Sequence, residues 1–252
     1  MNNLIIKRGR RYWDDVWSRD IRMRLPSSLN ISTKNIKSLL KTKVKPGMRV
    51  LEIGCAPGKM LAWMAKIMRV TVAGLDYSER GINSARKLFK SLEIEGDLRC
   101  EDIFCTTFSA GSFDFVYSLG VVEHFDDAAL IVRQHMNLLR PGGMAVVVIP
   151  NYGGIYGKVQ RRLDHENLLI HNLNIMSCQT MVQLAPRDLT RHVRAYVAGH
   201  ISPWILNFDK KWPGLSKVIF NIINVIGLFQ PLDIKSFCPM IVLEIIRNDN
   251  TA

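Results

Sequence analysis

The sequence lacks several features that would assign it to a familiar class of protein. Its five cysteines (Cys55, Cys100, Cys105, Cys178 and Cys238) form no C-x-x-C pair, and an odd number argues against a full disulfide framework. The N-terminus has too short an apolar core for a secretory signal peptide, so we expect a reducing cytoplasm. No arginine-rich repeat or aromatic RNA-binding signature is present, which disfavours a nucleic-acid partner.

Two common nucleotide-binding motifs are also missing from residues 49–59. A Walker loop needs four residues between its glycines, whereas three separate Gly54 from Gly58, and Met60 stands where Ser or Thr would follow the lysine. The dinucleotide fingerprint G-x-G-x-x-G would place glycines at Ala56 and Lys59. The stretch therefore belongs to neither class.

The composition is that of a folded protein with an excess of positive charge. A chain of 252 residues with 48% hydrophobic and 22% charged residues suits one α/β domain with a small insertion. The net charge of +12 favours an anionic partner, which can be a phosphorylated small molecule, an acidic membrane surface or nucleic acid. A basic but merely solvated surface is the alternative. Much of the excess lies in residues 7–24 and 34–49.

Residues 49–67 read as a strand, a tight loop and a helix. Val50, Leu51 and Ile53 form a short apolar run, which ends where the glycines begin. Gly54 and Gly58 permit backbone angles that other residues avoid, and such a loop can hold a nucleotide-like group against backbone N–H groups at a helix start.

The loop Glu52-Ile53-Gly54-Cys55-Ala56-Pro57-Gly58 resembles motif I of the class I S-adenosylmethionine (SAM) dependent methyltransferases, with Ala56 in place of the middle glycine. The resemblance implies SAM as cofactor. It also implies that the cofactor is contacted by Glu52, Gly54, Cys55, Ala56 and Gly58.

The second predicted strand, residues 70–76, ends in an acid. In a right-handed βαβ unit this end lies beside the end of the first strand, so Asp76 faces the ligand of the glycine loop and can accept hydrogen bonds from ribose hydroxyls. The alternative is that Asp76 caps the helix that follows from Ser78. Tyr77 can lie against the adenine.

Residues 98–103 form a short third strand that closes with Asp102. The resemblance implies that the Asp102 carboxylate meets the adenine amino group and that the Ile103 N–H meets a ring nitrogen. Alternatively, Asp102 simply starts a turn.

Residues 113–118 form the fourth strand, and the run 118–125 (Ser-Leu-Gly-Val-Val-Glu-His-Phe) resembles the post-strand motif of small-molecule methyltransferases related to the ubiquinone and sugar enzymes. Backbone of Ser118, Leu119 and Gly120 would line the methionine end of the cofactor. His124 would lie on the substrate side, either as a general base or as a structural pocket residue.

The remaining core elements complete a Rossmann-like fold. A helix over 128–139, a turn at 140–143 and a strand over 144–150 are followed, after a long interval, by a strand over 239–247. The resemblance implies an α/β fold with a seven-stranded, mostly parallel sheet, helices on both faces and an antiparallel last strand. We divide the chain into an N-terminal helical cap (1–45), a SAM-binding core (46–150), a substrate-side insertion with helices (151–235), and a closing strand with tail (236–252).

The substrate side is predicted from residues outside this core. Candidate substrate residues come from an N-terminal aromatic segment and a glycine-rich loop: Tyr12, Trp13, Trp17, Asn151, Tyr152 and Tyr156. The tripeptide at 164–166 has no second ligand cluster at helical spacing, so we expect no metal.

The most apolar segment, residues 214–229, carries Lys217, Asn221 and Asn224 on one helical face. It is too short and too polar for a membrane span, and is either an amphipathic helix packed on the domain or an interfacial helix at a membrane surface.

Together these features predict a SAM-dependent methyltransferase that methylates an oxygen of an anionic small molecule or glycan precursor, in particular a sugar nucleotide or a lipid-linked sugar of surface polysaccharide. Alternatives are an RNA methyltransferase that uses the basic N-terminal region and a non-catalytic SAM-fold partner protein.

Overall fold

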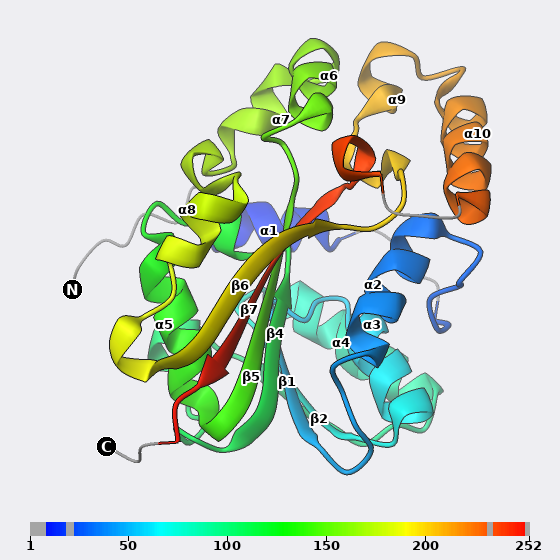
Figure 1. Ribbon diagram of the computed structural model, residues 1–252. Helices are drawn as coiled ribbons and strands as arrows, with labels where there is room; N and C mark the ends of the chain where they lie inside the picture. The colour runs from blue at the N-terminus through cyan, green and yellow to red at the C-terminus, as the bar shows by residue number, and fades with distance from the viewer. Residues whose placement is uncertain (1–8, 19–22, 231–233, 250–252) are drawn as a thin grey trace.

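Seven strands form one mixed sheet with helices on both of its faces (Figure 1). The computed structural model describes residues 9–18, 23–230 and 234–249. The strand order is β3-β2-β1-β4-β5-β7-β6, and β7 is antiparallel to both of its neighbours. This confirms the predicted fold. The strands are β1 (Arg49–Ile53), β2 (Thr71–Asp76), β3 (Asp97–Cys100), β4 (Phe113–Leu119), β5 (Leu139–Pro150), β6 (Thr190–Ala198) and β7 (Met240–Arg247).

Two hydrophobic cores lie on opposite faces of the sheet. One core joins the sheet to Leu40, Leu61 and Leu88, which come from α2 (Ile31–Lys41), α3 (Lys59–Trp63) and α4 (Glu79–Ser91). The other joins it to Ile131 and Met181, from α5 (Ala128–Leu138) and α8 (Cys178–Gln183). Because both faces are covered, the central strands are apolar on both sides, which explains their nearly continuous apolar runs in the sequence.

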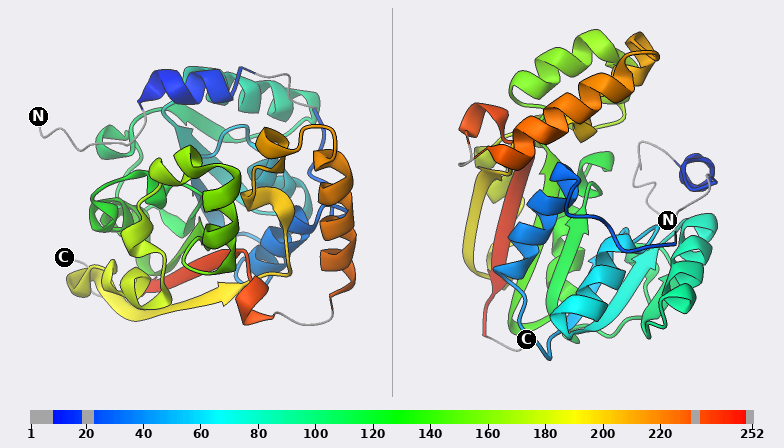
Figure 2. Two further views of the ribbon diagram at one scale, coloured as in Figure 1. Left: turned by 90° about the horizontal axis from the view of Figure 1, so that it is seen from above. Right: turned by 90° about the vertical axis from the view of Figure 1, so that its right-hand side faces the viewer.

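The other helices lie at the edge where the parallel strands end. Four of them lie beyond the carboxyl ends of the parallel strands (Figure 1): α6 (Ile155–Leu163), α7 (His165–Leu169), α9 (Phe208–Lys211) and α10 (Ser216–Phe229). Helix α1 (Arg10–Val16) runs beside α4 (Figure 2), where the Ser78 hydroxyl donates to Asp14 Oδ1 over 2.6 Å. The basic residues at 7–8 and 19–22 lie outside the described residues.

Several elements differ from the prediction. Strand β3 ends at Cys100, so Asp102 follows the strand instead of closing it. Residues 140–143, predicted as a turn, belong to β5. The region 151–235 was predicted as an insertion with helices but also contains β6, an edge strand of the sheet. Several β6 side chains are exposed, so the strand lacks the continuous apolar run that marks the central strands.

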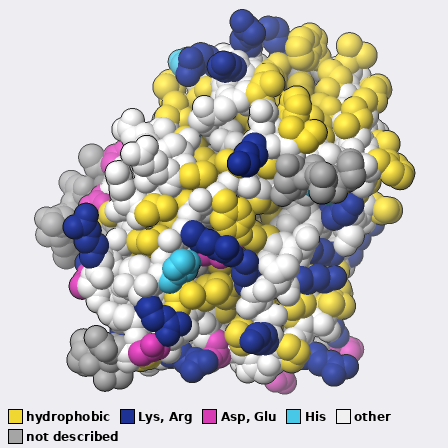
Figure 3. Space-filling view, in the orientation of Figure 1, with side chains coloured by type: hydrophobic (Ala, Val, Ile, Leu, Met, Phe, Trp, Pro, Cys, Tyr) yellow, Lys and Arg dark blue, Asp and Glu magenta, His cyan; other side chains and the backbone are white. Residues whose placement is uncertain are grey.

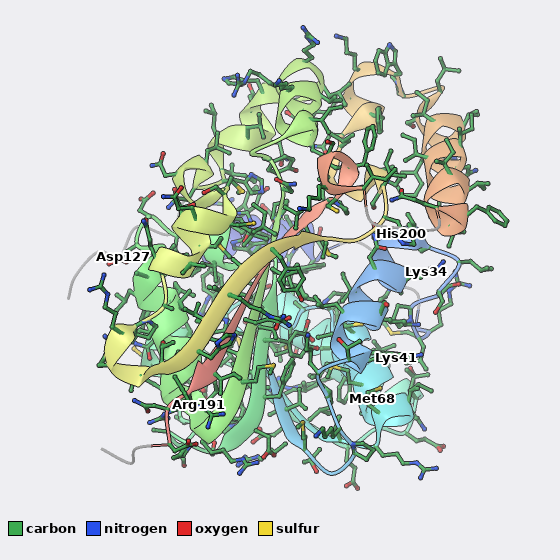
Figure 4. All side chains as sticks on the ribbon, in the orientation of Figure 1. Lys34, Lys41, Met68, Asp127, Arg191 and His200 are labelled. Carbon is green, nitrogen blue, oxygen red and sulfur yellow. The ribbon has the colours of Figure 1, made fainter. Side chains whose placement is uncertain are left out.

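Helix α10 packs on the domain through polar groups and leaves apolar side chains in solvent. The Asn224 amide accepts from Ile31 N–H (2.8 Å) and donates to Leu29 O (2.9 Å), which fixes it to the start of α2. Lys34 and His200 lie beneath its C-terminal end (Figure 4), where they contact the Leu228 and Gly227 carbonyl oxygens at 3.0 Å. Among the described residues, no helix has both the length and the apolarity to cross a membrane.

Strands β1 and β4 share a buried polar pair. Glu52 and Tyr117 are register partners, and the Tyr117 hydroxyl donates to Glu52 Oε2 over 2.8 Å. Burial raises the pKa of Glu52 to about 8, although the tyrosine hydrogen bond opposes this rise. Glu52 is therefore largely protonated at neutral pH in the folded chain but ionised in the unfolded chain.

This difference makes stability depend on pH. Between about pH 4.5 and 8 the folded chain binds more protons at Glu52 than the unfolded chain, so the free energy of unfolding falls as pH rises, by at most about 1.4 kcal/mol per pH unit from this group. We expect Glu52→Gln to flatten that dependence in urea titrations from pH 5 to 8. The exposed control Glu79→Gln should retain the wild-type slope, and equal slopes in all three proteins would contradict the assignment.

Candidate functional site

A cavity of about 480 Å³ opens at the carboxyl ends of β1, β2, β4 and β5. Its size lies within the range of small-molecule sites. The lining includes most of the predicted site residues: Trp13, Trp17, Gly54, Ala56, Asp76, Tyr77, Asp102, Ile103, Leu119, Gly120, His124 and Tyr152.

The glycine loop after β1 is shaped to let a ligand approach the backbone. Gly54 has a φ of 71°, and a Cβ there would lie 2.4 Å from the side chain of Val121. The N–H groups of Gly54 and Cys55 both donate to Leu75 O, at 2.8 and 3.1 Å, which fixes the loop to β2. Only glycine fits this turn, and the result is a cradle of exposed main chain against the cavity.

Asp76 connects this loop to the next one. Its Oδ2 accepts from Ala56 N–H (3.2 Å) and its Oδ1 from Ser78 N–H (2.9 Å). The N-cap of α4 is Ser78, whose hydroxyl oxygen accepts from Gly81 N–H, so the alternative role of Asp76 as that cap is wrong. Burial raises the pKa of Asp76, and the two backbone donors oppose that rise. The carboxylate lines the cavity with lone pairs available for the ribose hydroxyls of a nucleoside.

Asp102 and Ile103 bound the same end of the cavity. Asp102 caps a 3-10 helix, Ile103–Cys105, by accepting from Phe104 N–H over 3.0 Å. The turn-forming alternative is therefore confirmed. It does not displace the adenine role, because both residues still line the cavity.

The segment after β4 turns at Gly120, where φ is 71° and the N–H donates to Val148 O over 2.8 Å. Leu119 and Gly120 line the cavity. Ser118 does not, because it is fully buried one residue earlier in β4, with its hydroxyl 2.9 Å from His135 Nε2. Burial lowers the pKa of His135 to about 4, so this histidine is a neutral packing residue.

His124 lies in the 3-10 helix Val122–His124 and faces the cavity. Its Nδ1 is 3.1 Å from Ile170 O, and because a carbonyl oxygen only accepts, Nδ1 carries the proton. Its ring packs against Trp13 and His171, with both centroid distances 4.9 Å. Tyr152 lies edge-on to His171 at 5.2 Å.

Two residues of this region were missed as site residues by the sequence reasoning. Glu123 is 1% exposed and lines the cavity, and its pKa is raised to about 8 by burial. His171 reaches His124 from 47 positions along the chain, a proximity that no local pattern in the sequence reveals.

Three of the predicted cofactor residues in the glycine loop lie outside the cavity lining. Glu52 is turned toward Tyr117 beneath the loop. The Cys55 thiol points into the core, where a Cβ on Gly74 would lie 2.7 Å from it. Gly58, with a φ of 82°, forms the N-cap of α3. These three residues support the loop from the side that faces away from the cavity.

Three of the predicted substrate residues are also turned away from the cavity. The Asn151 amide donates to Cys238 O over 2.9 Å. The Tyr156 hydroxyl donates to Phe237 O over 2.9 Å and accepts from Ser202 N–H over 3.1 Å. Tyr12 packs edge-on against Trp13 outside the lining. These three side chains stabilise the wall of the cavity and do not face its interior.

Comparison with known proteins agrees with this geometry. Residues 51–147 match the family described as "Methyltransferase domain". Phosphoethanolamine N-methyltransferase 1 of Arabidopsis thaliana is 32% identical over 109 residues, which are 42% of this chain and 22% of that protein. Ubiquinone biosynthesis O-methyltransferase of Sinorhizobium medicae (strain WSM419) is 34% identical over 105 residues, 42% of each chain. The chain thus spans less than half the length of these curated relatives.

A solved structure shows the same fold. Haemonchus contortus phosphoethanolamine N-methyltransferase 2, in complex with phosphomonomethylethanolamine and S-adenosylhomocysteine, superimposes with a TM-score of 0.58 at 16% identity. The match covers 85% of this chain and 52% of that one. The backbone cradle at Gly54 and the acids at Asp76 and Asp102 fit the nucleoside part of such a cofactor. Residues 51–147 of this chain therefore match a methyltransferase domain, and the cavity at the ends of their strands fits SAM as its cofactor.

Proposed function

We propose that this protein transfers a methyl group from SAM to an oxygen of an anionic small molecule, with a sugar nucleotide or lipid-linked sugar as the favoured class. The observation that carries the proposal is a single cavity with two chemically different ends. Gly54, Asp76 and Asp102 form an end suited to a nucleoside, and His124 with Tyr152 forms an end suited to an acceptor.

The residues of this chain have distinct roles in such a transfer. When bound, SAM supplies an electrophilic methyl group on a sulfonium. The lone pair of His124 lies on Nε2, because Nδ1–H is donated to Ile170 O. Nε2 can accept the proton of an acceptor hydroxyl as the new oxygen–carbon bond forms and the carbon–sulfur bond breaks. Correct placement of the acceptor oxygen supplies much of the rate.

Helix α1 covers the cavity. Trp13 of this helix and Trp17, which follows its last residue, line the cavity. Asp14 ties the helix to the start of α4 by accepting from the Ser78 hydroxyl (2.6 Å) and from Arg80 N–H (3.3 Å). Two tryptophans over the cavity exclude water from the reacting groups.

The substrate class rests on charge and on the relatives. The net charge of +12 favours an anionic acceptor. The relatives are named as O- and N-methyltransferases of small molecules, which supports a small acceptor over RNA. The glycan preference rests on the resemblance of residues 118–125 to the post-strand motif of the ubiquinone and sugar enzymes. The glycine-rich loop 150–157 follows β5, and its Tyr152 lines the cavity.

Cofactor binding tests the nucleoside end. We expect Asp76→Ala to raise the Kd for SAM about 10- to 100-fold in calorimetry, because it removes a carboxylate acceptor and releases two loop N–H groups. The exposed neighbour Glu79→Gln is the matched control and should bind as the wild type does. Unchanged affinity for SAM in Asp76→Ala would contradict the proposed contact of Asp76 with the ribose. A wild-type chain that binds neither SAM nor its demethylated product would contradict the proposal that the protein is a methyltransferase.

Transfer of label tests the acceptor end. With methyl-labelled SAM and a cell extract from the source, we expect label in lipid-extractable or small polar material, and a rate at least about 100-fold lower for His124→Ala. His192→Ala, an exposed histidine of β6, should keep the wild-type rate. Label in ribonuclease-sensitive material would instead identify an RNA methyltransferase, and an unchanged rate in His124→Ala would exclude its catalytic role.

We also propose that the protein works in the cytoplasm at an anionic membrane surface. Val218, Ile222, Val225 and Ile226 form one face of α10 and are each more than half exposed, and Phe229 at its end is 82% exposed. Figure 3 shows hydrophobic side chains gathered over α9 and α10 at the upper right. Lys211, Lys217 and Lys235 lie before, within and after this helix in the chain. An exposed apolar helix face with lysines close to it in the chain, on a protein of net charge +12, fits the headgroup region of an acidic bilayer.

Vesicle sedimentation tests this surface. We expect the wild type to bind vesicles with anionic lipid and not neutral ones, and Ile222→Asp with Val225→Asp to abolish binding without changing the Kd for SAM. Ile67→Asp, at an exposed apolar residue outside α10, is the control. Binding that the double variant retains would contradict the proposal, as would dimerisation through this face in place of lipid binding.

A further inference from the structure

Three side chains of the types that ligate metals converge at the acceptor end of the cavity. One ligand atom from each of Glu123, His124 and His171 lies within 4.8 Å of the other two. All three side chains are buried, with 1%, 7% and 8% exposure. Glu123 and His124 line the cavity wall, so an ion held here would face the acceptor.

The Glu123 carboxylate has an unsatisfied atom. Its Oε2 is buried and finds no hydrogen-bond partner among the described residues. A buried carboxylate oxygen without a partner is costly, and the usual compensations are a hydrogen bond, an ionic partner or a metal ion. A cation bound at Glu123 Oε2 would therefore compensate for the burial of this carboxylate.

The two histidines are held in a tautomer whose Nε2 atom can ligate a metal. His124 Nδ1 lies 3.1 Å from Ile170 O, and His171 Nδ1 lies 2.6 Å from Asn167 O. Both Nδ1 atoms therefore carry the proton, and both Nε2 atoms carry the lone pair. A backbone carbonyl that receives the second ring N–H is the common outer contact of histidines that bind metals.

The segments that carry these ligands are fixed to each other by backbone contacts. Asn172 N–H donates to Glu123 O over 2.6 Å, and the Asn172 amide donates to Phe125 O (3.1 Å) and Asp126 O (3.2 Å). These bonds hold the turn after α7 against the 3-10 helix Val122–His124. The convergence is therefore built into the main chain.

We propose that Glu123, His124 and His171 bind one divalent transition-metal ion, with zinc as the representative, and leave a coordination position open to the acceptor oxygen. Two imidazole nitrogens and one carboxylate oxygen suit zinc and its neighbours better than magnesium or calcium. Ligands of a tetrahedral zinc site with bonds of roughly 2.1 Å stand about 3.4 Å apart. The ligand atoms, which lie within 4.8 Å of one another, therefore need to approach by at most about 1.4 Å.

An ion here would change the roles given above. With His124 as a ligand, the metal would orient the acceptor oxygen and make its hydroxyl more acidic. One carboxylate leaves a net positive charge on a divalent site, which attracts an anionic acceptor. This use of the ion rests on the proposed function, whereas binding of the ion does not. The segment 164–166 takes no part, since Asp164 pairs with Lys210 and Asn207 and His165 is exposed.

Zinc titration of the full chain, stripped with a chelator, tests the site. We expect one zinc ion per chain by calorimetry, and Co²⁺ in its place should give visible d–d absorption with nitrogen ligation. Glu123→Gln and His171→Ala should each weaken zinc binding by more than about 100-fold. The matched control His165→Ala, an exposed histidine in the same helix region, should bind as the wild type does.

The variants also separate this inference from the proposed function. Glu123→Gln is nearly isosteric, so it should keep its Kd for SAM within about threefold, and it decides the test if His171→Ala fails to fold. A wild-type chain that binds SAM but no zinc overturns the metal site and leaves methyl transfer standing. Zinc affinity that is unchanged in Glu123→Gln, or lost equally in His165→Ala, also overturns it.

Discussion

The hydrogen bonds at Asp76 are the interaction on which the rest of the site depends. This one carboxylate takes the N–H of Ala56 from the loop after β1 and the N–H of Ser78 from the loop after β2. Ser78 in turn binds Asp14 of α1. A continuous series of polar contacts therefore runs from the glycine loop, through the acid, to the helix that covers the cavity. Loss of the Asp76 carboxylate would therefore weaken the packing of both the glycine loop and helix α1.

The parts of the site that obey local rules could be predicted from the sequence. Gly54 must adopt a positive φ beneath Val121, and Asp76 must end a parallel strand next to that loop, so residue type and spacing indicate both. The mostly parallel, seven-stranded sheet with an antiparallel β7 was expected from the resemblance to the methyltransferase family, and the structure agrees. The edge strand β6 was not predicted, because it is exposed along much of its length and does not carry the apolar run of a central strand.

The parts that depend on distant contacts could not be predicted. The approach of His171 to His124 is fixed by backbone hydrogen bonds from Asn172, which leave no trace in residue periodicity. Asn151 and Tyr156 were reasonable substrate residues by position, yet their polar groups are used by the carbonyls of Cys238 and Phe237. The partners of buried acids could not be predicted either. Glu52 and Glu123 are both buried, but a tyrosine hydroxyl donates to the carboxylate of Glu52, whereas Glu123 Oε2 has no hydrogen-bond partner among the described residues.

The way α1 is held has a consequence for the order of events in turnover. None of its residues is fully buried, yet Trp13 and Trp17 close the cavity from this helix. The cover is therefore among the weakest-held parts of the wall, and its opening should cost far less than unfolding of the sheet beneath it. Exchange of spent cofactor for fresh SAM can then proceed by lifting one short helix, a movement that would also uncover the His124 ring against which Trp13 packs.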